Sequence, residues 1–364
     1  MTTQSPAPPA PPVRIDPFDY EARPVRVVFG PGRITEVAAE ADRLGLRRVM
    51  LIADSRAPGG DALVAALGER LALRWDEIAQ HVPIELAERA RKAAVADEVD
   101  GLVSLGGGSA TGLAKAIALD TGLPIVAVPT TYAGSELTPV YGMTGEQRKR
   151  TGTDERVRPA VVVYDPELTL GLPPEVTGPS AFNAIAHCFA ALWSPKRDPL
   201  TSACAVDAIR TITASLPTLV DDPADLQARA GLQYGAFLAG TALGRAGTGL
   251  QHKICHELGG RLNLSHADTH AVVLPHVVAL NTAPGPDWVA RLEPFLGADP
   301  SRGLWELARG CGLATDLAQL GAHREHLHAV AEAAAGTANP VPVDVPTIEA
   351  LLGRALGHEP PRAS

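Results

Sequence analysis

Strand-like apolar segments alternate with helical segments in the first half of the chain and are absent from the second half. Runs that indicate strands lie at residues 25–29, 49–53, 101–105, 124–129 and 160–164. The helical segments between them include 34–44, 62–72, 84–96 and 110–119, and from about residue 176 only helical segments follow. Strands alternating with helices are typical of a parallel sheet covered by helices. The pattern therefore predicts an α/β domain followed by an all-helical domain.

These segments divide the chain of 364 residues into three parts. Residues 1–20 begin with a proline-rich run, which is expected to form a disordered tail. Residues 21–175 are expected to form the α/β dinucleotide-binding domain, and residues 176–364 the all-helical catalytic domain. A cleft between the two domains is the expected place for a small ligand.

Charge and cysteine usage exclude several classes of partner. The net charge of -9 argues against nucleic acid or an anionic membrane surface. No apolar run reaches the roughly 18 to 20 residues needed to span a bilayer, and the N-terminus lacks a signal-peptide pattern. The four cysteines are scattered without a C-x-x-C pair, as in reduced proteins. The sequence predicts a cytoplasmic protein.

A glycine-rich turn joins the strand at 101–105 to the next helix. It reads Gly106-Gly107-Gly108-Ser109. Glycines allow a pyrophosphate to approach the backbone closely, and the N-terminus of the following helix offers unpaired N–H groups. A tight turn without a ligand is the alternative interpretation.

Polar residues also follow two other strands. Thr130, Thr131 and Tyr132 come directly after the strand at 124–129, and Asp54 follows the strand at 49–53. An acidic residue in this position binds a ribose hydroxyl in many nucleotide-binding sheets, although it can equally be a simple cap. Loops at the ends of neighbouring parallel strands together predict a dinucleotide site at one edge of the sheet.

Histidines are concentrated in the helical half. Helical spacing relates His252 to His256 and His266 to His270, and His187 lies four residues after Asn183. Histidine is suited both to proton transfer near neutral pH and to metal binding. The alternative is that these imidazoles satisfy hydrogen bonds in a core. Their number favours a site on the helical side of the cleft.

Five stretches taken together resemble the iron-containing alcohol dehydrogenase family, over residues from about 25 to 356. The resemblance implies an α/β domain with a helical domain, and a nicotinamide cofactor. Within the family the residues are most similar to those of maleylacetate reductases. The stretches are residues 106–118, 129–136, 164–170, 183–188 and 252–270.

The resemblance also departs from the family at the metal site. Metal-dependent members hold the ion with an aspartate and three histidines, and the positions that match are Asn183, His187, His252 and His266. An amide replaces the anionic ligand, and Gly112 stands where those members have a further aspartate. We therefore expect no catalytic metal; if one binds, these four residues would hold it.

The resemblance implies NAD(P)H-dependent reduction of the carbon–carbon double bond of maleylacetate to 3-oxoadipate, in the breakdown of aromatic compounds. His256 is the expected proton donor, with His252 second and His187 and His266 as further catalytic candidates. The dicarboxylate substrate would be held by residues drawn from Tyr132, Lys149, Arg245, Lys253 and His270.

For the cofactor, the resemblance implies pyrophosphate binding at the glycine turn, Gly106 to Ser109. Thr130 and Thr131 would lie near the adenosine, and Tyr132 near the nicotinamide. Asp54 would repel a 2′-phosphate, so NADH is preferred, with NADPH possible.

Other interpretations stay open. The chain could be an iron- or zinc-dependent alcohol or polyol dehydrogenase, a reductase of another enone acid in a biosynthetic pathway, or a binding protein without activity. A homodimer is expected, because the strand at 25–29 could pair across subunits.

Overall fold

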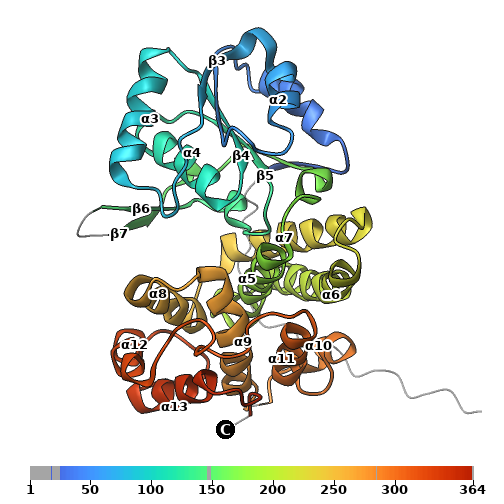
Figure 1. Cartoon of the computed structure of the whole chain (residues 1–364), viewed down its shortest axis with the longest axis vertical. Coiled ribbons are helices and arrows are strands. Elements are labelled where there is room, and N and C mark those ends of the chain that lie inside the picture. Colours follow the sequence, from blue (N-terminus) through green and yellow to red (C-terminus); the bar gives the residue numbers. More distant parts are fainter. Residues whose placement is uncertain (1–17, 19–24, 146–148, 284, 363–364) are drawn as a thin grey trace, which may run out of the picture.

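The computed structural model describes residues 18, 25–145, 149–283 and 285–362. Figure 1 shows two bodies, with the α/β part above and the helical part below. The predicted fold class is confirmed, because a parallel sheet occupies the first part of the chain and helices alone form the second. The expected tail at residues 1–20 lies outside the described residues, apart from Phe18.

The main sheet has six parallel strands in the order β1-β8-β5-β4-β2-β3. Residues of β2, β4 and β5 are buried almost throughout, as expected for a sheet covered on both faces. The strands are β1 (Arg26–Phe29), β2 (Val49–Ala53), β3 (Leu71–Trp75), β4 (Gly101–Gly106), β5 (Ile125–Pro129) and β8 (Val161–Tyr164).

Helices cover both faces of this sheet. Alternate residues of β2 point to opposite sides, so that Met50 packs with α3 and α4, whereas Leu51 packs with α1 and α2. These helices are α1 (Val37–Arg43), α2 (Gly60–Leu67), α3 (Ile84–Ala96) and α4 (Gly108–Thr121). Short 3-10 turns lie at η1 (Arg33–Glu36), η2 (Gly68–Arg70), η3 (Ser135–Leu137), η4 (Glu155–Val157) and η5 (Pro166–Thr169).

The prediction of a helix at residues 62–72 is wrong at its C-terminal end. Helix α2 stops at Leu67, and strand β3 begins at Leu71. Gly68 has a φ of 52°, which ends the helix at that point. The strand lies at the edge of the sheet, where its side chains are only partly buried.

A hairpin follows β5 and is anchored on α4. Its strands are β6 (Val140–Thr144) and β7 (Lys149–Thr153), which pair antiparallel. The buried Lys115 Nζ of α4 donates to the carbonyl oxygens of Ser135 at 2.7 Å, Thr138 at 2.9 Å and Val140 at 2.8 Å. Burial lowers the pKa of Lys115 to about 7. This side chain fixes the path of the loop after β5.

The helical part packs around one large apolar core. It begins with α5 at Pro174, so the boundary that we place after residue 175 falls in the first turn of that helix. Its helices are α5 (Pro174–Trp193), α6 (Pro199–Asp221), α7 (Leu226–Ala246), α8 (Leu250–Leu262), α9 (His266–Thr282), α10 (Trp288–Leu296), α11 (Pro300–Gly310), α12 (Leu327–Ala334) and α13 (Val345–Leu356), with a 3-10 turn η6 (Arg324–His326).

Within the described part of the chain, α6 is the one helix whose length and hydropathy would permit it to cross a membrane. It packs against α5 and α7, and the core helix of a globular protein can meet the same criteria.

Candidate active site

The glycine turn and the loop after β5 pack directly against each other. Gly106 ends β4 with a φ of 148°, and Gly107 immediately precedes α4. A Cβ added to Gly107 would lie 3.0 Å from Thr131 Cγ2, which is closer than a side chain allows without movement. Thr130 N donates to Gly106 O at 3.1 Å. The turn thus exposes backbone at the N-terminus of α4, as an anion site requires.

Asp54 lies beside this turn because of the strand order. β2 and β4 are neighbours, with Ala53 in register with Leu105, so the residues that follow these two strands meet at the same edge. The Asp54 side chain is exposed, and its Oδ1 accepts from Arg56 N at 2.8 Å. The structure therefore brings Asp54 and the glycine turn together.

Tyr132 is placed differently from what the sequence suggested. Its side chain is fully buried in the core of the helical part. The hydroxyl accepts from Arg229 Nη1 at 3.4 Å, and Tyr132 N donates to Ser180 Oγ at 3.0 Å. Burial in this conformation leaves the Tyr132 side chain no surface for a nicotinamide or a substrate.

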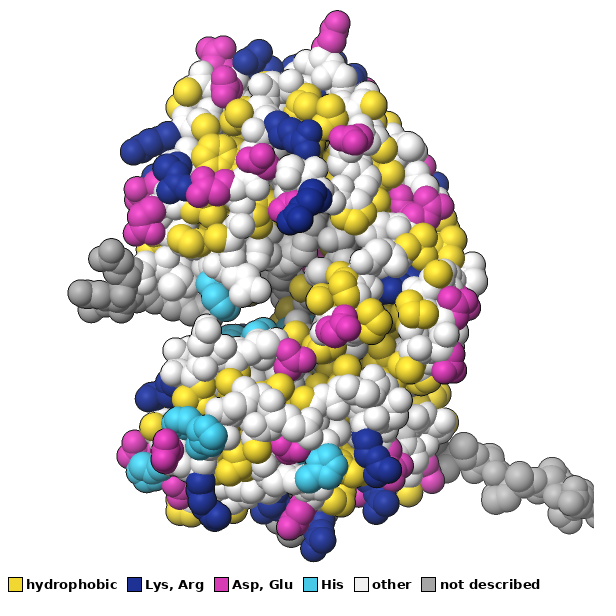
Figure 2. All heavy atoms as spheres, in the orientation of Figure 1, with side chains coloured by type: hydrophobic (Ala, Val, Ile, Leu, Met, Phe, Trp, Pro, Cys, Tyr) yellow, Lys and Arg dark blue, Asp and Glu magenta, His cyan; other side chains and the backbone are white. Residues whose placement is uncertain are grey.

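Five histidines of the helical part come together in one cluster. The ring centroids of His187 and His252 are 4.5 Å apart and stacked, and those of His252 and His270 are also 4.5 Å apart. His266 lies 4.4 Å from His270 and 5.1 Å from His256. Figure 2 shows a cleft between the two bodies, with histidine side chains at its walls.

A hydrogen-bonded row connects part of this cluster. Gln251 Nε2 is 2.8 Å from His270 Nδ1, and His270 Nε2 is 3.0 Å from His266 Nε2. A neutral His270 that accepts from Gln251 therefore donates to His266, which fixes the tautomers of both rings. Sequence reasoning missed Gln251, although it directly precedes His252 on the same helix. It also missed the backbone of Ala133, which hydrogen-bonds His187.

Burial keeps the inner imidazoles uncharged. It lowers the pKa of His187 to about 4 and the pKa values of His252 and His270 well below the usual value, with neighbouring histidines adding to the effect. His256, by contrast, is exposed at the edge of the cluster. The site thus combines neutral, buried imidazoles inside with an exposed imidazole, that of His256, at its edge.

The cationic candidates for substrate binding are mostly engaged elsewhere. Lys253 Nζ lies 2.7 Å from Glu257 Oε1, and Arg245 Nε lies 2.9 Å from the buried carboxylate of Asp198. Lys149 begins β7, and its side chain lies outside the described residues. The structure therefore brings His270 to the cluster, whereas Arg245 and Lys253 are held in ion pairs.

The residues at the family's metal position fit an iron ion poorly. Asn183 Oδ1, His187 Nδ1 and both ring nitrogens of His252 are buried without a partner, but His266 Nε2 is bonded to His270. None of the four positions supplies an anionic ligand. Among the described residues, no three His, Cys, Asp or Glu side chains are arranged to hold a metal. No step of the chemistry below passes through one.

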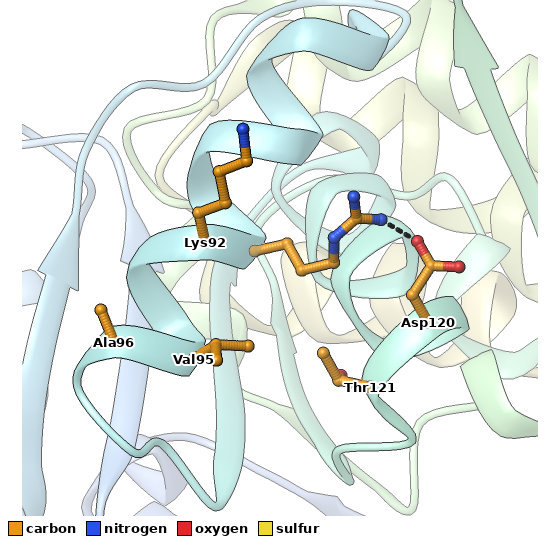
Figure 3. A pocket seen from close by; sticks show the side chains of 6 residues that line it. Lys92, Val95, Ala96, Asp120 and Thr121 are labelled. Atoms are coloured by element: carbon orange, nitrogen blue, oxygen red, sulfur yellow. Dashed lines mark hydrogen bonds and ion pairs between the residues drawn. The ribbon is translucent and has the colours of Figure 1, made fainter.

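A depression on the outer surface lies between α3 and the C-terminal end of α4 (Figure 3), where an ion pair joins Arg91 to Asp120. The glycine turn is at the opposite end of α4, at Gly108. The depression is thus separate from the site. It is lined by Arg91, Lys92, Val95, Ala96, Asp120 and Thr121.

The buried histidines make stability depend on pH. The pKa of both His187 and His276 is lowered by burial to about 4, so the unfolded chain binds protons between pH ~6.5 and ~4 that the folded protein does not. We expect the free energy of unfolding to fall on acidification through that window, by up to roughly 3 kcal/mol for each group.

Urea unfolding at several pH values measures this effect. His276→Leu, which leaves the cluster intact, should weaken the pH dependence relative to the unchanged chain. A free energy of unfolding that is flat across the window would contradict the neutral, buried state of these side chains.

Comparison with known proteins agrees with this geometry. Residues 24–166 match the model of the iron-containing alcohol dehydrogenase family, and residues 177–356 match that of its C-terminal part. The chain belongs to the iron-containing alcohol dehydrogenase family. The resemblance seen in the sequence is thereby confirmed.

Named relatives are similar over nearly their whole length. The chain is 44% identical over 342 residues to a maleylacetate reductase of Burkholderia cepacia, which covers 93% of this chain and 97% of that protein. The crystal structure of maleylacetate reductase from Rhizobium sp. strain MTP-10005 superposes with a TM-score of 0.92 at 43% identity, over 95% of this chain and 100% of that one. The corresponding structure from Agrobacterium tumefaciens has a TM-score of 0.92 at 42% identity, with coverage of 95% and 100%.

These findings make the chain an oxidoreductase of an NAD-binding dehydrogenase family. The roles of the individual site residues remain predictions.

Proposed function

We propose that the chain reduces the carbon–carbon double bond of maleylacetate to 3-oxoadipate, with NADH as preferred donor, in the breakdown of aromatic compounds. The named relatives support the substrate. The single observation that carries the proposal is the histidine cluster itself, in which the inner imidazoles are uncharged and the amide of Asn183 stands in place of an anionic metal ligand. The dicarboxylate is the expected small-molecule partner.

The reaction needs two contributions from the chain. Bound NADH would supply hydride to the alkene carbon β to the ketone, so that negative charge develops on the ketone oxygen. Both ring nitrogens of His252 are buried without a partner, so its N–H is available to donate to that oxygen. His256 is accessible and adjacent to His252 and His266, and it would protonate the other alkene carbon, which is bonded to the ketone carbon.

The N-terminus of α4 would hold the cofactor pyrophosphate. Gly107 and Gly108 expose backbone there, Ser109 follows in the first turn, and Thr131 forms the facing wall. Helix N-termini bind such anions through free N–H groups and the helix dipole. We also propose that the protein is cytoplasmic and dimeric. β1 lies at an edge of the sheet, where it is available for pairing with a second subunit.

Metal independence is part of the proposal. One observation favours the competing function, a metal-dependent alcohol dehydrogenase. Asn183 Oδ1 and both His252 ring nitrogens are buried without a hydrogen-bond partner, and a bound metal ion would satisfy such atoms. The two functions differ in their response to a chelator. Purified protein is mixed with NADH and maleylacetate, and loss of NADH absorbance is followed with and without a strong chelator. Turnover that the chelator leaves unchanged is the expected result; turnover of alcohols that the chelator abolishes would overturn the proposal.

Asp54 is expected to set the cofactor preference. Its exposed carboxylate stands beside the glycine turn and would repel a 2′-phosphate. Asp54→Ala should therefore raise kcat/KM for NADPH relative to NADH by about tenfold. Asp61→Ala, in the first turn of α2, removes an acidic side chain elsewhere on the same body and serves as the control. An unchanged NADPH-to-NADH ratio in Asp54→Ala would exclude this role.

A further inference from the structure

Two consecutive residues before α3 have an unusual backbone conformation. His81 has a φ of 61° and Val82 a φ of 48°. Residues that carry a Cβ rarely adopt these backbone φ angles, which persist only where the surrounding structure imposes them. Strain of this kind is frequent in segments that position functional residues.

Contacts on two sides hold this loop. Val82 is 4% exposed, and its Cγ2 would lie 2.9 Å from a Cβ added to Gly112 of α4. Val82 O accepts from Thr144 N of the β6–β7 hairpin at 3.0 Å. The missing side chain at Gly112, where metal-dependent relatives have an aspartate, thus gives Val82 its place on α4. The loop is pinned between the helix and the hairpin.

His81, the residue before the buried Val82, is exposed to solvent near helix α4, which follows the glycine turn. The side chain of His81 is exposed, and no hydrogen bond or ion pair within the described ranges holds it. Gly112 lies about one helical turn, roughly 6 Å along the axis, from Gly108 at the start of α4. His81 is the one histidine that the sequence contains before His187, and it belongs to the α/β part of the chain.

A dianionic substrate needs more positive charge than the cluster provides. His187 and His252 are buried and uncharged, and Arg245 and Lys253 lie in ion pairs. An exposed imidazole, in contrast, can take up a proton when a carboxylate approaches it. The substrate has one carboxylate on the alkene carbon that accepts hydride, and that end must lie against the nicotinamide. The other carboxylate, on the far side of the ketone, is free to reach the cleft opening.

We propose that His81 binds this second carboxylate from the α/β wall, opposite the histidine cluster, and so selects diacids over monoacids. The inference rests on the proposed function.

The test compares two substrates in two variants. His81→Asn and His81→Gly both suit a left-handed backbone, so neither adds strain to the loop. The probes are maleylacetate and cis-4-oxopent-2-enoate, which has the same enone and carboxylate but a methyl group in place of the carboxymethyl group. Both variants should lose about 10- to 100-fold in kcat/KM for maleylacetate, through KM. Their KM for NADH and their kcat/KM for cis-4-oxopent-2-enoate should equal those of the unchanged enzyme.

The results distinguish a failure of His81 as a carboxylate ligand from a failure of the proposed function. Equal losses with both substrates would show that the loop, and not the imidazole, matters, and would overturn the inference alone. Undiminished maleylacetate reduction in both variants would do the same. If the unchanged enzyme reduces neither compound, the proposed function fails and the inference falls with it.

Discussion

His256→Ala is expected to lower kcat for maleylacetate reduction by about 10²- to 10⁴-fold, the range that a general acid contributes. His256 is exposed at the edge of the histidine cluster, with its ring centroid 5.1 Å from His266 and 6.5 Å from His252. Burial holds the inner imidazoles of His252 and His270 neutral, whereas the His256 side chain is exposed to solvent. Truncation of an exposed side chain should leave the fold and the affinity for NADH intact.

His328→Ala is the matched control for that variant. His328 is also an exposed histidine, but it lies on α12 and forms an ion pair with Glu349 at 2.7 Å. Activity should be unchanged in this control. If His256→Ala retains kcat while His252→Ala loses it, the proton donor is the second candidate, and the assignment to His256 is wrong.

Gly108→Val is expected to weaken NADH binding by about 100-fold, since small misplacements at such sites have effects of this size. The nearest atom to a Cβ at this position is Ala133 Cβ at 3.9 Å, an ordinary contact, so valine fits the folded chain. The added methyl groups would instead occupy the space over the N-terminus of α4, where the pyrophosphate needs to approach the backbone.

Gly353→Val supplies a control with the same chemical change. Gly353 lies in α13, and nothing lies within 4 Å of a Cβ added there. Fluorescence titration with NADH should show normal affinity in this control and weak binding in Gly108→Val. Normal affinity in both variants would mean that the glycine turn does not hold the cofactor.

Local sequence patterns predicted the parts of the site that depend on neighbouring residues. The glycine turn follows from a strand, three glycines and a helix in succession, and the structure places these elements as expected. The spacing of four between His252 and His256, and between His266 and His270, likewise places each pair on one helix face. Each of these features involves residues only a few positions apart in the chain, so the local sequence determines it.

Other features depend on contacts that no local pattern contains. The pairing of Arg245 with Asp198 spans 47 residues, and it removes an apparent substrate ligand. The direction of Tyr132 is set by Arg229, which reaches it from α7. Likewise, the left-handed backbone at His81 could not be expected from a histidine, because it results from Val82 packing on Gly112. Long-range packing, more than composition, decided these positions.

The central claim is that the chain reduces a conjugated double bond and not a ketone, and the fate of the transferred hydride tests it most directly. Maleylacetate is reduced with NADH that carries deuterium at the transferring position of the nicotinamide, and the product is analysed by NMR. The account predicts deuterium on the former alkene carbon that bears the carboxylate, with the ketone retained. Deuterium on a carbinol carbon, formed by reduction of the ketone to an alcohol, would contradict it.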